Sequence, residues 1–234
     1  MAYSLIEHGD DRALIAAVAA RLASALDDAL ALRNTALLAL AGGRTSPPIF
    51  RSLAAQARDW RAVHVVPSDE RWVARAHADS NLRQMQEAFT AAAGIDWIAL
   101  APPLPGGAPD AHFANSALVA HAAEFDATLL RMRADGTFPS LLPGAPNLAA
   151  GLDPQSRDAA IAIMPDPMPA AGPHPRISLT LARLLRSRRV LLAIGGADKR
   201  ATLEHALREN DPLRHPVAAL LHAPQAEVEI HWSP

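Results

Sequence analysis

The sequence predicts an α/β protein with a mostly parallel sheet and helices on both faces. Short apolar runs alternate with helical patterns along most of the chain, as strands and helices do in parallel sheets. The runs are continuously apolar, which is typical of strands that are covered on both faces. Several of them end in glycine pairs or polar turn residues, where a strand would leave the sheet.

The first helix is predicted from about 11 to 33, where an apolar residue recurs every fourth position at Leu14, Val18, Leu22 and Leu26. A buried strand follows at 36–40, and the pair Gly42 and Gly43 indicates a tight turn after it. Ser46 is expected to cap the helix that comes next, which has proline at its first position.

The rest of the chain continues this alternation. Helices are predicted over 81–93, 111–125 and 198–208. Strands are predicted at 63–66, 97–100, a run ending at Met132, 160–163, 177–180 and 189–194, with a last edge strand at 228–230. We therefore predict one Rossmann-like domain over residues 1–234.

Composition excludes several classes of function. The chain has 234 residues, a formal net charge of −2 and no cysteine, so neither a nucleic-acid surface nor a thiolate metal site is expected. No two of the ten histidines stand three or four apart on a predicted helix, and we predict no metal site. The N-terminus lacks the pattern of a signal peptide, and no apolar run approaches the roughly 20 residues of a membrane span. A cytoplasmic protein without membrane contact is expected.

Four loops follow predicted strands and are candidates for a binding site. In open α/β sheets, ligands bind beyond the carboxyl ends of the strands, so parallel strands would bring these loops to one edge. The loops are 41–47, 67–72, 133–140 and 195–199.

Each loop has a feature that suits an anion. Gly42 and Gly43 allow close approach of the backbone to a ligand, Arg44 and Arg71 offer paired N–H donors, and Lys199 is a cation in the first turn of a helix. Taken singly, the glycines could be an ordinary turn, and the charges could be solvated surface residues. The glycine pair matches neither a P-loop nor a dinucleotide-binding fingerprint.

Together, five segments resemble one family in order and spacing. These are AGGRTSP at 41–47, DERWV at 69–73 with Ser80-Asn81, RMRADGTFPSLLPG at 131–144, RISLT at 176–180 and GGADK at 195–199. They resemble the signatures of the 6-phosphogluconolactonases, whose fold is shared with glucosamine-6-phosphate deaminases and ribose-5-phosphate isomerases. The resemblance covers essentially the whole chain.

The resemblance implies hydrolysis of 6-phosphogluconolactone to 6-phosphogluconate in the oxidative pentose phosphate pathway, without metal or cofactor. It implies a small sugar-phosphate substrate and a monomer or weak homodimer. Catalysis would involve the loop of Asp135 and Thr137, where water attacks the lactone carbonyl. Residues expected to bind the substrate are Gly42, Gly43, Arg44, Asp69, Arg71, Arg176 and Lys199.

The catalytic loop departs from the family pattern at three positions. The family's expected general base is the histidine of a DGH motif, and Thr137 stands in its place. A positioned general base contributes about 10²–10⁴-fold, and a threonine hydroxyl cannot supply it near neutral pH. Arg131 and Arg133 replace two glycines and alternate with Met132, so on a strand they share one side and would add charge to a pocket there.

Three functions stay open. The first is a lactonase with an altered site, in which Asp135 activates water or a histidine such as His64 or His174 reaches in from another loop. The second is a non-catalytic sugar-phosphate binder that has lost the base. The third, an isomerase or deaminase of the wider fold, has no motif that favours it.

Overall fold

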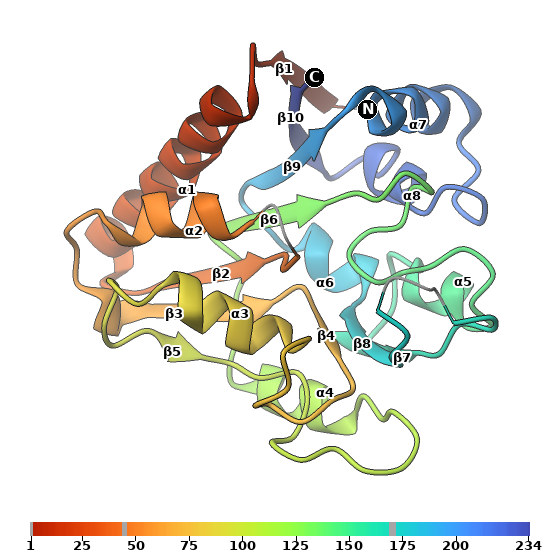
Figure 1. Cartoon of the computed structure of the whole chain (residues 1–234), viewed down its shortest axis with the longest axis horizontal. Coiled ribbons are helices and arrows are strands. Elements are labelled where there is room, and N and C mark those ends of the chain that lie inside the picture. Colours follow the sequence, from red (N-terminus) through yellow and green to blue (C-terminus); the bar gives the residue numbers. More distant parts are fainter. Residues whose placement is uncertain (1, 44–45, 169–171) are drawn as a thin grey trace.

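A seven-stranded parallel sheet forms the centre of the computed structural model, which describes residues 2–43, 46–168 and 172–234. The strand order is β1-β10-β9-β6-β2-β3-β5 (Figure 1). The strands are β1 (Ala2–Glu7), β2 (Ala36–Leu40), β3 (Val63–Pro67), β5 (Asp96–Trp97), β6 (Ala127–Arg131), β9 (Val190–Gly195) and β10 (Glu227–Ser233). The predicted fold class is confirmed.

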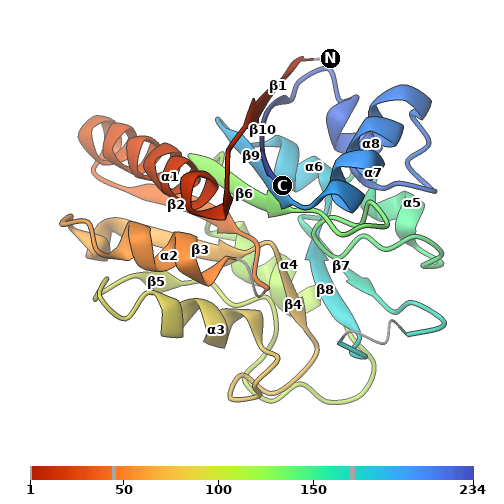
Figure 2. The ribbon, with the colours of Figure 1, turned by 45° about the horizontal axis from the view of Figure 1, so that its top comes forward.

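Helices cover both faces of this sheet. They are α1 (Asp11–Arg33), α2 (Pro47–Ala54), α3 (Asn81–Ala88), α4 (His112–Val119), α5 (Leu148–Gly151), α6 (Leu181–Leu185), α7 (Ala197–Glu209) and α8 (Val217–Leu221), with a short 3-10 turn at Trp60–Ala62. Figure 2 shows α1, α2 and α3 together on one side and α7 and α8 on the other. None of the described helices is both long and apolar enough to cross a membrane.

The central strands β2, β3, β6 and β9 contribute alternate side chains to two hydrophobic cores, because successive residues of a strand point to opposite faces. Leu38 and Leu40 of β2 pack with α1 and α2 in one core. Leu37 and Ala39 of the same strand lie in the other core, with residues from α4, α6, α7 and α8. This double burial explains why the strands have continuous apolar sequences.

A second, three-stranded antiparallel sheet, in the order β4-β8-β7, lies beyond the carboxyl ends of β2 and β3. Its strands are β4 (Asp69–Arg71), β7 (Ala160–Ile163) and β8 (Arg176–Leu179). The backbone connects the two sheets at Ser68, whose N–H donates to Leu40 of β2 at 2.8 Å and whose carbonyl accepts from Leu179 at 2.9 Å. The sequence did not predict β4, because this strand is three residues long and fully charged.

Several predicted boundaries were wrong. The run at 228–230 is not an edge strand: β10 lies between β1 and β9, and β1, which the sequence did not predict, forms the edge. The predictions at 81–93, 97–100 and 111–125 were too long, because their last residues form turns and loops. Ser46 precedes α2, but its hydroxyl donates back to the Gly42 carbonyl at 3.1 Å and does not cap the helix.

Candidate functional site

The predicted strand-end loops meet at one cavity of about 480 Å³. It lies where β2, β6 and β9 end and where β4 begins after β3 (Figure 1). Its lining comprises Ala41, Gly42, Gly43, Asp69, Arg71, Asn81, Arg131, Met132, Arg133, Ala134, Pro139, Arg176 and Lys199. Six of the nine site residues predicted from the sequence are in this set, and Arg44 lies outside the described residues.

The glycine pair allows close backbone packing at the cavity wall. A Cβ atom on Gly42 would lie 2.3 Å from Oδ1 of Asn81, so a larger residue would displace that side chain. Gly43 has a φ of +94°, which side-chain-bearing residues rarely adopt. The structure of this turn therefore favours glycine at both positions, whether or not they bind an anion as predicted.

Buried Glu70 explains the spacing between DERWV and Ser80-Asn81. Its carboxylate accepts from the backbone N–H groups of Asn81 at 2.7 Å, Leu82 at 2.9 Å and Arg71 at 2.8 Å, and from the Ser80 hydroxyl at 3.0 Å. Burial raises the pKa of Glu70, and these hydrogen bonds oppose the shift. The carboxylate thus joins the start of α3 to β4 and fixes where Arg71 emerges.

Arg71 and Arg176 lie directly opposite each other on the antiparallel strands β4 and β8. Arg71 donates through Nη1 to the Asp79 carbonyl at 3.1 Å and to the Asn81 side chain. Arg176 donates through Nη2 to the Gly172 carbonyl at 2.8 Å, and burial lowers its pKa. The Nε atom of each guanidinium is buried and has no hydrogen-bond partner among the described residues.

Two further cations line the cavity: Arg131, at the carboxyl end of β6, and Lys199, in the first turn of α7. Burial lowers the pKa of Arg131 to about 10. Burial, and next the nearby Arg131 charge, lower the pKa of Lys199. In the described part of the chain neither side chain forms a salt bridge, so both charges are available to an anion. Lys199 is also the only lysine in the sequence.

One carboxylate, that of Asp69, lines the cavity among the described residues. Its Oδ2 accepts from the Ser140 hydroxyl at 2.5 Å, and its Oδ1 accepts from the Ser68 hydroxyl at 3.2 Å. Against it stand Arg71, Arg131, Arg133, Arg176 and Lys199. This excess of positive charge makes the cavity suited to a ligand with more than one negative charge.

Asp135 and Thr137 do not line the cavity, although Ala134 beside them does. Thr137 is 1 % exposed, and its hydroxyl has no hydrogen-bond partner among the described residues. Asp135 is exposed, with Oδ2 at 3.7 Å from Nε of Arg133. Their roles in activating or positioning water stay predictions.

No histidine lines the cavity in the described part of the chain. His64 pairs with Asp96 at 2.8 Å at the start of β3, at the other end of the sheet from the cavity. His174 pairs with Asp79 at 2.8 Å, two residues before Arg176. Neither therefore lines the cavity in this structure.

Sequence reasoning missed the polar residues Asn81 and Ser140, which connect the charged groups of the cavity. Asn81 accepts from Arg71 and donates to the Asp69 carbonyl at 2.8 Å, and Ser140 contacts both Asp69 and Arg176. Both residues lie in segments that resemble the family signatures, Ser80-Asn81 and 131–144. The resemblance was therefore the sequence signal that could have identified them. Arg131 and Arg133 both line the cavity, and so does Met132 between them. Because β6 ends at Arg131, the expectation that the two arginines share one side of a strand stays a prediction.

Comparisons with known proteins place the chain in one family. Residues 9–232 match the family model of glucosamine-6-phosphate isomerases/6-phosphogluconolactonase. The chain is 35% identical to a 6-phosphogluconolactonase of Pseudomonas putida, over 97% of this chain and 92% of the relative. It is 37% identical to one of Pseudomonas aeruginosa, over 93% and 89%.

A solved structure has the same fold along almost its whole length. The crystal structure of a 6-phosphogluconolactonase from Shewanella baltica superposes with a TM-score of 0.91 and 27% identity, and covers 99% of this chain and 98% of that one. From the family match and the two relatives, we conclude that the chain belongs to the glucosamine-6-phosphate isomerase/6-phosphogluconolactonase family.

Proposed function

We propose that this protein hydrolyses 6-phospho-D-glucono-1,5-lactone to 6-phosphogluconate, with a site that differs from the family pattern. The observation that carries the proposal is the cavity in which Arg71, Arg176 and Lys199 converge beside the Gly42–Gly43 turn. Guanidinium groups with unpaired N–H donors suit a phosphate oxygen, and a lysine supplies a further point charge. Relatives at 35% and 37% identity that carry the lactonase name support the same substrate class.

The reaction requires a water molecule to bond to the lactone carbonyl carbon while the ring C–O bond breaks. The ring oxygen takes up a proton, and the new carboxyl group loses one at neutral pH. The cationic cavity would stabilise the negative charge that develops on the carbonyl oxygen. Asp69 is the lining carboxylate, and we propose that it orients the attacking water.

The test is an assay with freshly generated lactone, in which formation of 6-phosphogluconate is followed against the spontaneous rate in buffer. Hydrolysis well above that rate in the wild type, and a loss of it in Asp69→Asn, would support the proposal. Hydrolysis no faster than buffer, by protein that is folded and pure, would count against a lactonase.

A non-catalytic binder is the second candidate, and two observations favour it. The residue at the position of the expected base, Thr137, is buried and does not line the cavity. Arg131 and Arg133 bring the lining cations to five, which suits the phosphate and carboxylate of 6-phosphogluconate better than a lactone with one anionic group. A binder predicts that 6-phosphogluconate raises the melting temperature while lactone turnover is absent.

We propose that the protein acts in the cytoplasm as a monomer or weak homodimer. The proposal on assembly is tested by sedimentation equilibrium at several protein concentrations. A tight dimer at nanomolar concentration would contradict it.

A further inference from the structure

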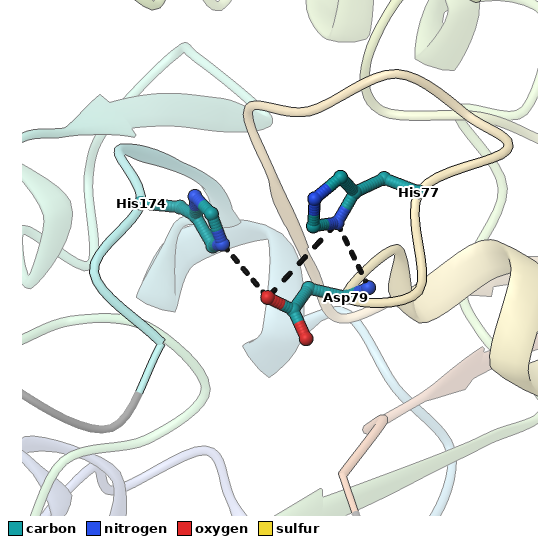
Figure 3. A group of neighbouring side chains, drawn as sticks. All are labelled: His77, Asp79 and His174. Carbon is teal, nitrogen blue, oxygen red and sulfur yellow. Dashed lines mark hydrogen bonds and ion pairs between the residues drawn. The ribbon is translucent and has the colours of Figure 1, made fainter.

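Two histidines and an aspartate from separate segments form a cluster beside the cavity. His77 and Asp79 belong to the loop between β4 and α3, and His174 to the segment before β8 (Figure 3). Nε2 of His174 lies 2.8 Å from Oδ2 of Asp79, and Nδ1 of His77 lies 4.0 Å from the same oxygen. One nitrogen or oxygen from each side chain lies within 4.8 Å of the others.

The hydrogen bonds leave electron-rich atoms facing one another. Nδ1 of His77 accepts from the backbone N–H of Asp79 at 3.1 Å, so in the neutral ring this nitrogen carries a lone pair and no proton. The neighbouring Asp79 oxygen is also an acceptor. A cation between the two would take the Nδ1 lone pair in place of the Asp79 N–H, bind the Asp79 carboxylate, and use the second imidazole, His174, as a further ligand.

The backbone around the cluster is already anchored. The Asp79 carbonyl accepts from Arg71, and the Trp72 N–H donates to the Pro175 carbonyl at 2.8 Å. Both segments therefore extend from the strand pair in which Arg71 and Arg176 are opposite each other. The backbone of these two segments thus holds the three side chains near one another.

We propose that His77, Asp79 and His174 bind a divalent transition metal of the zinc class. Zinc takes imidazole nitrogen and carboxylate oxygen at about 2.0–2.2 Å, which brings tetrahedral ligand atoms to about 3.3 Å from one another. Mg²⁺ and Ca²⁺ prefer sets made of oxygen, so this mixed set disfavours them. His77 and Asp79 are about half exposed, which leaves room for water as a fourth ligand.

Such a metal would cross-link the two segments that adjoin Arg71 and Arg176. This structural role of the metal does not depend on lactone hydrolysis. The proposal concerns metal binding alone, and it holds whether the cavity turns over its ligand or only binds it.

The test is isothermal titration of tag-free protein with ZnCl2, in a buffer without chelating groups, with MgCl2 in parallel. The wild type should bind one equivalent of Zn²⁺ and no Mg²⁺ at the same concentrations. His174→Gln and Asp79→Asn should each bind at least about tenfold more weakly, since removal of even an outer partner of a metal ligand commonly costs 10–100-fold. Circular dichroism verifies that each variant is folded.

His64→Gln is the matched control. His64 pairs with Asp96 at 2.8 Å, as His174 does with Asp79, but it belongs to no three-residue cluster in the described part of the chain. This variant should bind Zn²⁺ like the wild type, and Zn²⁺ should raise the melting temperature of both until a chelator reverses the shift. No saturable Zn²⁺ binding by the wild type, or equal binding by the wild type, His174→Gln and Asp79→Asn, would overturn the proposal.

Discussion

Oδ1 of Asp135 accepts a hydrogen bond from the backbone N–H of Thr137 at 2.9 Å. Two backbone bonds close the same turn, from Arg133 to the Thr137 carbonyl at 3.1 Å and from Gly136 to the Arg133 carbonyl at 3.0 Å. These bonds do not involve the side chain at position 137. The hydrogen bonds of this turn therefore do not depend on which side chain stands at position 137.

Restoring the imidazole should restore the general base. We expect Thr137→His to raise the rate of lactone hydrolysis, by up to the 10²–10⁴-fold typical of a positioned base. The triple variant with Arg131→Gly and Arg133→Gly should exceed the single variant, because the two arginines occupy the cavity and their charge disfavours protonation of an imidazole. The measurement is kcat/KM with fresh lactone. A folded triple variant no faster than the wild type would show that the base belongs elsewhere.

Thr137→Val tests the buried hydroxyl itself. Valine has nearly the shape of threonine, and the Thr137 hydroxyl is buried without a partner among the described residues. An unsatisfied buried polar group costs about 1–3 kcal/mol, so the variant should gain about 1 kcal/mol in free energy of unfolding. Urea denaturation measures the difference. A loss of stability would mean that the hydroxyl has a hydrogen-bond partner in solution.

Lys199 can be labelled almost selectively, because it is the only lysine in the chain. Its lowered pKa leaves more free amine at pH 8 than an ordinary lysine has, so pyridoxal phosphate followed by borohydride should modify it readily. Arg131→Gly should raise the pKa of Lys199 and slow the labelling at pH 8. Mass spectrometry locates the label, with Lys199→Arg as the control.

An anion in the cavity should protect this lysine from the reagent. We expect 6-phosphogluconate to slow the labelling of Lys199, while the labelling of the N-terminal amine is unchanged. Equal rates with and without 6-phosphogluconate would place its binding site away from Lys199.

The long helices and the strand-end turns were predictable because local sequence determines them. Helix α1 has an apolar residue at every fourth position from Leu14 to Leu26, and the turns after β2 and β9 contain glycine pairs. Parallel strands with buried faces then place those turns at one edge by geometry alone. The sequence therefore predicts that Gly42, Arg71 and Lys199 are neighbours, and all three line the cavity.

The remaining features depend on long-range pairing that no local pattern reveals. β4 is short and charged, and it forms only because β8 lies opposite. The meeting of His174 with His77 and Asp79 follows from that pairing, so helical spacing of histidines could not predict it. The burial of Thr137 is also a long-range effect, because its loop packs against a distant part of the chain. A Cβ on the neighbouring Gly136 would lie 2.9 Å from Cα of His215.

A stacked histidine pair that does not line the cavity predicts a loss of stability in acid. His8 Nε2 and His231 Nδ1 lie 3.0 Å apart, and His231 is buried. Burial, with the neighbouring His8, lowers the pKa of His231 to about 4. The unfolded chain, with an ordinary pKa near 6.5, binds this proton more readily, so stability falls as pH drops from about 6.5 to 4.

The full loss would approach about 3 kcal/mol at pH 4. Urea unfolding of the wild type and His231→Asn between pH 7 and 4 measures it, and the variant should show a shallower dependence. His112→Gln, which removes an exposed histidine, is the control and should behave like the wild type. Parallel curves for the wild type and His231→Asn would contradict the assignment.

The central claim is that separate strand-end turns form one binding site for an anionic sugar. Isothermal titration of 6-phosphogluconate into the wild type, Lys199→Met, Arg71→Gln and the exposed-surface control Arg61→Gln tests it most directly. We predict one saturable site in the wild type and in Arg61→Gln, and affinity at least about tenfold lower in the other two, since a charge-assisted hydrogen bond contributes about 1.5–3 kcal/mol. No binding by the wild type, or equal binding by all four proteins, would contradict the claim.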